Sequence, residues 1–424
     1  MRRSFVHLLA VAAAAFAATS AWAQAPVKIG IVTFLSGPAA GPFGVPARNA
    51  AEIMAESLNA GRVPGAYATK GFGGAPVEIV LIDEAGGPQK QVQELRNLAQ
   101  RVDLVIGYIS SGDCLAVAPV AEELKKLTVL FDCGTPRIFE DASYRYVFRT
   151  GATATGDAVA LARYVLDRRP GVKSFAGINQ NYAWGQDSWN DFEAAMKALK
   201  PDVEVKTSQM PKLFAGQFGA EISTLLSSNA EVIHSSFWGG DLEGLVLQGA
   251  PRGLFQKHLV LLAAGEPAIN RLGTKIPDGT IIGARGPFGP FSPGTELDKW
   301  FRATFQERYG VPPNYAAYKM AQALLGVKSA SEKAQKAGAA TPTQEQIIGA
   351  LENLTFEAPG GTVRMALGKG HQAAQEMVYA RYKKVGGKPT IENVVRYPAE
   401  CVNPPDGTSA EKWIEGGFPG AKCN

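Results

Sequence analysis

The stretch from residue 27 to residue 44 reads VKIGIVTFLSGPAAGPFG and decides the fold. Its first seven residues are mostly apolar or β-branched, which is typical of a strand buried on both faces of a parallel sheet. Glycines and prolines between 37 and 44 then predict a tight loop. The next segment, 47–60, has the apolar spacing of a helix and ends at Gly61. A buried strand, a loop and a helix in this order predict the start of an α/β fold.

The same alternation of strands and helices continues along the chain. In the first half, strands are expected at 77–82, 103–108 and 128–132, with helices at 89–100 and 115–126. A break follows at 149–156. In the second half, strands are expected at 174–178, 203–205, 232–237 and 259–264, with helices at 157–167, 186–199, 218–227 and 242–249. Because βαβ units build parallel sheets covered on both faces, this pattern predicts two doubly wound lobes.

The N-terminus has the pattern of a secretory signal peptide. Met1, Arg2 and Arg3 are followed by an apolar run at 6–18 and by the small-x-small pattern Ala21-Trp22-Ala23. Residues 1–23 are therefore expected to be removed near Ala23, and the mature chain is expected to be exported. The apolar run is too short to span a membrane.

Composition restricts the partners and the cofactors. Charged residues make up 19% of the chain and the net charge is +4, with no dense stripe of Lys and Arg, so nucleic acid is not an expected partner. The histidines are scattered and no CxxC or HxxxH spacing occurs, so no metal or other cofactor is expected.

Four cysteines in an exported chain suggest disulfides. Three pairings are possible, and closeness in sequence favours Cys114 with Cys133 and Cys401 with Cys423.

The candidate site follows from the rule that ligands bind beyond the carboxyl ends of parallel strands. Three loops of the first lobe reach that edge, and they carry Phe43, then Ser111 and Gly112, then Cys133 and Thr135. Hydroxyls and free N–H groups at a helix start suit an anion such as a carboxylate. Each residue also has a simpler interpretation, since Phe43 could pack on the helix, Ser111 could be a cap and Thr135 an ordinary turn residue.

Three loops of the second lobe carry Trp184, Trp238 and Glu266 at the corresponding edge. Indole rings stack on flat or apolar parts of a ligand, and a carboxylate pairs with an ammonium or an amide N–H. Taken singly, each tryptophan is more often a filler of the core. The placement of all three at successive strand ends favours a binding site.

At this point the chain resembles the periplasmic branched-chain amino-acid-binding proteins, which are type I solute receptors of ABC importers. The resemblance rests on the order of four stretches, at residues 28–38, 106–112, 147–150 and 184–185. It implies the type I periplasmic binding protein fold, with two lobes joined by three crossings. The implied first lobe is 26–149 plus 285–355, the second is 150–284 plus 356–398, and 399–424 is expected to form an irregular tail.

The resemblance also assigns roles to the candidate residues. Ser111 and Thr135 look like the hydroxyl residues that meet a ligand carboxylate, and Cys133 stands where the family offers backbone contacts. Phe43 looks like the ring near the first loop. Trp184 and Trp238 replace two tyrosines of the family, and Glu266 looks like the acidic residue that holds an ammonium group.

The expected function is therefore binding without catalysis. A monomeric protein in the periplasm is expected to close around an amino acid or a related small carboxylate or amide and dock on an ABC permease in the inner membrane. If Glu266 faces the site, an amine or amide is favoured; if it points away, an aromatic or aliphatic acid is. A sensor module for a membrane receptor remains an alternative. A hydrolase with Ser111 or Cys114 as nucleophile is less favoured, because there is no GxSxG motif and His234 is expected inside a strand.

Overall fold

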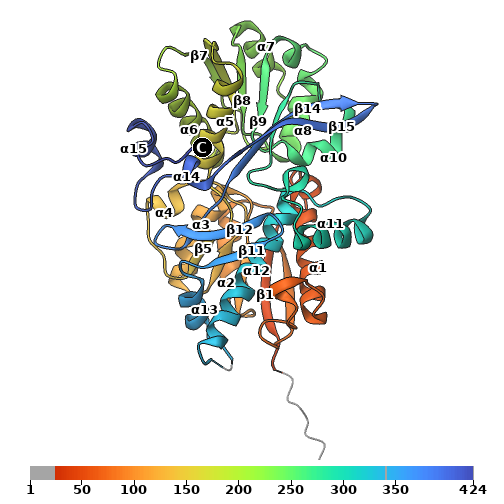
Figure 1. Ribbon diagram of the computed structural model, residues 1–424, viewed down its shortest axis with the longest axis vertical. Coiled ribbons are helices and arrows are strands. Elements are labelled where there is room, and N and C mark those ends of the chain that lie inside the picture. Colours follow the sequence, from red (N-terminus) through yellow and green to blue (C-terminus); the bar gives the residue numbers. More distant parts are fainter. Residues whose placement is uncertain (1–23, 340, 424) are drawn as a thin grey trace, which may run out of the picture.

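The computed structural model describes residues 24–339 and 341–423, and these residues fold into two lobes (Figure 1). In Figure 1 the first lobe is the lower one and contains β1, and the second lobe lies above it. The signal peptide expected at residues 1–23 lies outside the described residues.

The first lobe is built on an eight-stranded sheet with β1, Val27–Thr33, near one side of it. Ile31 pairs in parallel register with Leu81 on one neighbour and with Ile106 on the other. Strand β1 is paired on both sides and mostly buried on both faces, which explains its nearly unbroken apolar run. The sheet order is β2 (Val77–Asp83), β1, β3 (Leu104–Gly107), β4 (Thr128–Leu130), β5 (Val147–Arg149), β13 (Gln372–Ala374), β12 (Gly361–Leu367) and β11 (Thr355–Ala358).

The second lobe is built on a seven-stranded sheet. Its strands β6 to β10 pair in parallel, whereas β14 and β15 form an antiparallel ribbon at the edge. The sheet order is β7 (Glu204–Gln209), β6 (Ser174–Ile178), β8 (Val232–Ser235), β9 (Leu259–Leu262), β10 (Ile281–Gly283), β14 (Met377–Val385) and β15 (Lys388–Tyr397). The prediction of two parallel-sheet α/β lobes is confirmed.

Helices cover both sheets. In the first lobe these are α1 (Val45–Ala60), α2 (Pro88–Leu98), α3 (Ser111–Glu123), α4 (Arg137–Glu140), α11 (Glu296–Tyr309), α12 (Tyr315–Lys336) and α13 (Gln344–Leu351). In the second they are α5 (Ala154–Arg168), α6 (Ala183–Leu199), α7 (Gly219–Ser228), α8 (Gly239–Gly249), α9 (Leu254–Lys257) and α10 (Glu266–Leu272). Helix α1 ends as predicted at Gly61, whose φ of 66° gives the left-handed cap that glycine adopts without strain.

The chain crosses between the lobes three times, after β5, after β10 and between β13 and β14. The third crossing differs from the expected boundary at 355/356. Strands β11, β12 and β13 belong to the first sheet, because β13 pairs with the exposed edge of β5 through Gln372 and Arg149. The segment 356–398 is thus shared between the two sheets, and only its part from β14 onward lies in the second.

The C-terminal tail is more ordered than expected. It forms two short helices, α14 (Ala399–Val402) and α15 (Ala410–Glu415), which lie beside α5 and α6 (Figure 1). Trp413 of α15 is fully buried in the core of the second lobe. Disulfides join Cys401 to Cys423 and Cys114 to Cys133, so the favoured pairing of the four cysteines is confirmed.

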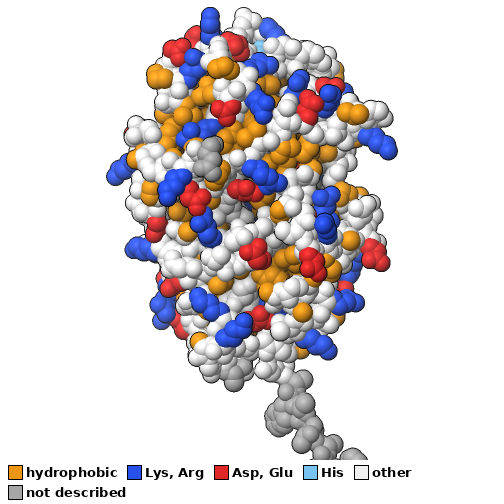
Figure 2. All heavy atoms as spheres, in the orientation of Figure 1, with side chains coloured by type: hydrophobic (Ala, Val, Ile, Leu, Met, Phe, Trp, Pro, Cys, Tyr) orange, Lys and Arg blue, Asp and Glu red, His pale blue; other side chains and the backbone are white. Residues whose placement is uncertain are grey.

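Surface charges of both signs are interspersed over the face drawn in Figure 2, with no stripe of a single sign. None of the helices in the described part of the chain has the length and apolar character needed to cross a bilayer.

Removing the tail disulfide with Cys401→Ala and Cys423→Ala is expected to lower the free energy of unfolding by roughly 3 kcal/mol. The bond closes a loop across a sequence separation of 22 residues, and its loss increases the conformational entropy of the unfolded chain. Denaturant unfolding of the oxidised protein measures the change. An unaltered unfolding midpoint would show that this disulfide does not stabilise the folded state.

Candidate functional site

A small cavity lies between the lobes at the carboxyl ends of both sets of strands. Its volume is about 10 Å³, roughly the room that one water molecule needs. The first lobe lines it with Ile109, Ser111, Asp132, Gly134 and Tyr315, the second with Tyr182, Trp184, Trp238 and Ala264, and the crossing after β10 with Arg285.

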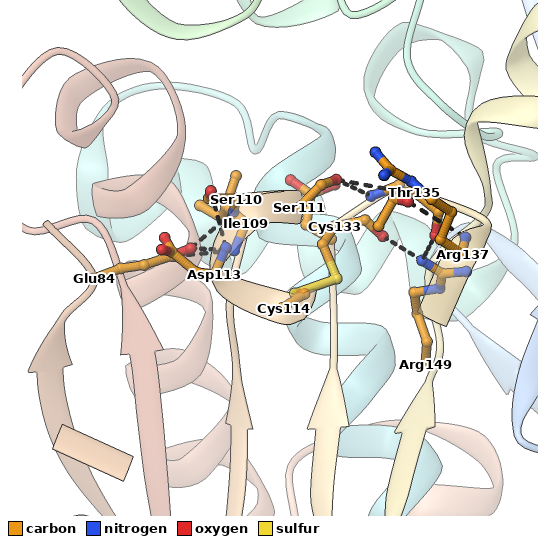
Figure 3. The surroundings of a disulfide bond; sticks show 12 residues. Glu84, Ile109, Ser110, Ser111, Asp113, Cys114, Cys133, Thr135, Arg137 and Arg149 are labelled. Atoms are coloured by element: carbon orange, nitrogen blue, oxygen red, sulfur yellow. Dashed lines mark hydrogen bonds between the residues drawn. A yellow bond between two sulfur atoms is a disulfide. The ribbon is translucent and has the colours of Figure 1, made fainter. Parts of the chain in front are cut away.

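The loop that carries Ser111 is held by a buried carboxylate. Tyr108, at the end of β3, has a φ of 75°, which bends the chain sharply and is costly for a residue with a large side chain. The Glu84 carboxylate accepts hydrogen bonds from the N–H groups of Ile109 and Ser110 at 2.8 Å each (Figure 3). Burial, with the nearby Asp113 carboxyl next, raises the pKa of Glu84 well above its usual range. Glu84 thus fixes the start of α3.

Ser111 itself joins two loops of the first lobe. Its Oγ accepts hydrogen bonds from the N–H groups of Gly134 at 3.1 Å and Thr135 at 3.2 Å. The disulfide between Cys114 and Cys133 ties the same two segments together (Figure 3). Because both bonds use the oxygen as an acceptor, the hydroxyl proton of Ser111 stays available to a ligand in the cavity.

A buried cluster of charges forms one wall. The Arg285 Nη1 donates to the Asp132 carboxylate at 2.7 Å, and its Nε donates to Asp157 of α5 at 3.1 Å. Burial alone would lower the pKa of Arg285, but the attraction of the two carboxylates raises it overall. Arg285 thereby links a strand end of the first lobe to a helix of the second.

Lys319 of α12 adds a second cation to this cluster. Its Nζ donates to the Asp132 Oδ1 at 2.7 Å, and burial lowers its pKa to about 8. The other carboxylate oxygen of Asp132, Oδ2, is buried without a hydrogen-bond partner among the described residues. Asp132 lines the cavity, so this oxygen has an unused capacity to accept a hydrogen bond close to it.

Aromatic rings form the opposite wall. The Trp184 Nε1 donates to the Ser236 carbonyl at 2.8 Å, and the Arg285 guanidinium lies 4.2 Å from the centre of the indole. The Trp238 Nε1 donates to the Tyr182 hydroxyl at 2.7 Å, which leaves that hydroxyl with a proton to donate. The rings are therefore fixed in orientation before any ligand contacts them.

Gly134 allows the two walls to meet. A Cβ at this position would lie 2.4 Å from both the Arg285 Nη2 and the Trp184 Cζ3, closer than real Cβ contacts. The absence of a side chain at 134 lets the Trp184 indole pack directly on the backbone of the first lobe.

The lobes touch at further points around the cavity. Phe43 packs edge-on against Trp238 with ring centres 5.4 Å apart, and the Gly240 N–H donates to the Pro38 carbonyl at 3.0 Å. Arg137 of α4 pairs with Asp187 of α6 at 3.2 Å. These contacts close the cavity on several sides.

The comparisons with known proteins agree with this arrangement. The family model described as "periplasmic binding protein" matches residues 26–388. The chain belongs to the periplasmic binding protein family. A Leu/Ile/Val-binding protein homolog from Brucella melitensis is 26% identical over 391 residues, covering 89% of this chain and 88% of the relative.

Two solved structures illustrate the shared periplasmic binding protein fold. One is the solute-binding protein of an ABC transporter from Rhodopseudomonas palustris in complex with 3,4-dihydroxybenzoic acid, with a TM-score of 0.74 and 19% identity over 88% of this chain and 98% of that one. The other is a leucine-, isoleucine-, valine-, threonine- and alanine-binding protein from Brucella ovis, with a TM-score of 0.74 and 21% identity over 91% and 98%.

Only some of the residues predicted to bind ligand line the cavity of this periplasmic binding protein. Ser111, Trp184 and Trp238 do, and they come from both lobes. Phe43 lies behind Trp238, between it and Tyr315, and Gly112 lies beside Tyr182 outside the cavity lining.

Cys133 and Thr135 are fully buried and take part through the backbone. Their carbonyls both accept from the Arg149 Nη1, at 3.1 Å and 2.6 Å, while the Thr135 N–H donates to Ser111. They position the loop rather than facing the cavity.

Glu266 points away from the cavity. It is the first residue of α10, and its Oε2 accepts from the Tyr315 N–H at 2.9 Å. Its carboxyl also packs on Gly289, where a Cβ would lie 2.3 Å from the Glu266 Oε1. Burial raises the pKa of Glu266 to about 8.

Sequence reasoning did not single out Asp132, Tyr182, Arg285 and Tyr315. Asp132 and Tyr182 stand in the strand-end loops that the pattern identified, next to the residues selected. Arg285 and Tyr315 lie on a crossing and at the start of a helix, where no strand-end rule applies.

The histidine nearest a strand end is part of a core. His234 stacks on Phe192 with ring centres 4.4 Å apart, and burial lowers its pKa to about 3. Among the described residues, no group of three or more His, Cys, Asp or Glu side chains is placed to hold a metal ion.

The substitution Glu266→Gln is expected to flatten the pH dependence of stability. A carboxyl whose pKa is raised from 4.5 to about 8 stabilises the fold fully below pH 4.5, and this stability is lost as the pH rises through 8. The amide keeps an oxygen acceptor for the Tyr315 N–H and cannot ionise. The free energy of unfolding should therefore fall less in the variant between pH 5 and pH 8, by on the order of a few kcal/mol. Melting temperatures of both proteins over this range measure the difference. Parallel curves for both proteins would contradict this assignment.

Proposed function

We propose that this protein is the solute-binding component of an ABC importer, located in the periplasm after removal of its signal peptide. It captures a small ligand between its lobes and delivers it to a permease in the inner membrane. The observation that carries the proposal is the single cavity that joins Ser111 and Asp132 of one lobe to Trp184 and Trp238 of the other.

The lining defines the chemistry of the ligand. The Ser111 and Tyr182 hydroxyls have protons to donate, which suits a carboxylate near the start of α3. The free Asp132 Oδ2 needs a donor, which suits an ammonium or hydroxyl group. The rings of Trp184 and Trp238 suit a flat or apolar body. A carboxylate with a hydrogen-bond donor and an apolar or aromatic body meets all three conditions.

Amino acids and hydroxylated aromatic acids both meet these conditions. Relatives of the two kinds are known, one described as binding leucine, isoleucine, valine, threonine and alanine and another in complex with 3,4-dihydroxybenzoic acid. Glu266 faces away from the cavity, so the ammonium partner expected from the sequence does not line it. Asp132 takes its place as the one carboxylate among the described residues of the lining. Four aromatic rings in the lining favour the aromatic acid.

Binding requires the lobes to separate. A cavity of about 10 Å³ has no room for such a ligand, and interlobe contacts such as Arg137 with Asp187 surround it. The ligand enters between parted lobes, contacts the Ser111 side, and is enclosed when Trp184 and Trp238 return. It shifts the equilibrium only by binding the closed arrangement better than the open one.

The alternatives differ in what the site can do. For a hydrolase, Ser111 would need a base to take its proton, whereas its Oγ accepts two backbone N–H bonds and His234 lies in the core of the other lobe. A sensor module would use the same binding step, and the partner in the membrane distinguishes it from a transport receptor.

A thermal-shift panel of amino acids, amides, short acids and hydroxybenzoates tests the proposal. A ligand that binds only the folded protein stabilises it by about 2.7 kcal/mol at 100 times its Kd, so one class should raise the melting temperature by several degrees. Ser111→Ala should weaken binding about tenfold, because one hydrogen bond to a charged group is lost. Trp184→Ala should weaken it further through lost ring contact.

Ser227→Ala, on the exposed face of α7 and away from the cavity, is the control and should bind as the parent protein does. Full binding by both site variants would place the ligand elsewhere, and steady release of a hydrolysed product would exclude a purely binding function.

A further inference from the structure

A second and larger cavity lies beside the crossings, outside the interlobe site. Its volume is about 350 Å³, within the range of cavities that hold small organic ligands. Three parts of the chain line it: the region of α4, the first crossing with the β12–β13 turn, and the tail from Pro404 to Lys412.

The tail wall extends beyond the part of the chain that the family model matches, which ends at residue 388. It is fixed to the first lobe by two hydrogen bonds. The Lys369 N–H donates to the Asp406 carboxylate at 3.2 Å, and the Ala410 N–H donates to the Glu140 carboxylate at 3.0 Å. Its other end is fixed to the second lobe by the buried Trp413. The tail therefore encloses the cavity while touching both lobes.

The chemical feature of this cavity is Arg149, at the end of β5. The side chain is fully buried, and its hydrogen bonds with described residues go to neutral oxygens, those of Cys133, Thr135 and Gln372. Its Nη2 has no partner among the described residues. Burial lowers the pKa of Arg149 to about 9, so the group is still a cation at neutral pH. The Glu140 and Asp187 carboxylates attract this cation, yet its Nη2 hydrogen-bonds to neither of them. A buried donor without a partner is costly, so a ligand anion at Nη2 would be stabilising.

The remaining lining suits an organic anion. Lys369 and Lys412 are exposed at the cavity and carry positive charge. The two acidic residues of the lining, Glu140 and Asp406, are engaged in holding the tail. Apolar surface comes from Phe139, Tyr144, Leu367, Pro404 and Pro405.

We propose that this cavity is a second binding site, which takes a small organic carboxylate with an apolar body. The carboxylate meets the Arg149 Nη2, with Lys369 and Lys412 at the mouth, and the body lies on Phe139 and the tail prolines. The site is distinct from the interlobe cavity, so both can be occupied at once. Because Arg149 also holds the Cys133 and Thr135 carbonyls, next to the N–H groups that bind Ser111, occupancy of one site is expected to change affinity at the other.

The probe for this site is 4-fluorobenzoate, followed by fluorine NMR on the mature chain. Ser111→Ala and Trp184→Ala together disable the interlobe site, and this double variant should still bind the probe at one site. Adding Lys369→Glu and Lys412→Glu should raise the remaining Kd at least tenfold. Both lysines are exposed, so folding is not at risk. Lys299→Glu and Lys388→Glu, at exposed positions elsewhere, are the matched control and should change Kd less than twofold.

Crystals with 4-bromobenzoate locate the bound molecule, and an anomalous bromine peak in the cavity beside Arg149 is expected. Loss of all binding in the double variant would overturn the second site. The second site would also be overturned if Lys369→Glu and Lys412→Glu left the remaining Kd unchanged, or if the bromine peak lay elsewhere. None of these outcomes contradicts the interlobe site, which is tested separately by the weaker binding expected of Ser111→Ala and Trp184→Ala relative to the parent protein.

Discussion

The arrangement of the two lobes depends on one buried guanidinium. Arg285 sits on a crossing, stays protonated at neutral pH, and is paired with Asp132 on one side and Asp157 on the other. Its Nη2 also donates to the Ala152 carbonyl, which lies on a different crossing, at 3.1 Å. Removal of either carboxylate would leave a buried charge uncompensated, which is among the costliest defects in a protein interior. The φ of 52° at Arg285 shows that these bonds hold its backbone in a rarely occupied conformation.

The other crossings are linked to this centre by amides. Gln322 of α12 donates to the Thr150 carbonyl on the first crossing and exchanges hydrogen bonds of 3.1 Å with Gln375 on the third. A single helix of the first lobe thus contacts two crossings, while its Lys319 reaches Asp132. Under the proposed function, closure around a ligand would have to rearrange these polar contacts, because they join the segments that connect the two lobes.

The strands and loops were predictable where a local rule applies. The apolar run at 27–33 and the loops after β3 and β4 follow from the periodicity, and Ser111, Trp184 and Trp238 follow from their place after strands. Glu266 met the same rule, yet helix α10 begins at that residue and turns its carboxyl toward Tyr315. The segment after β10 brings three further residues to the site through tertiary packing: Arg285, Tyr315 and Lys319. No local sequence pattern predicts where this segment packs.

Gly134 has a consequence for the motion of the lobes. The Trp184 indole is fixed by its bond to Ser236, and the Arg285 side chain is fixed by its carboxylates, so neither can move aside easily. A single methyl group at position 134 would clash with both side chains and would prevent the lobes from packing as closely as they do here. The contact between the lobes at this point therefore depends on the absence of a side chain at position 134.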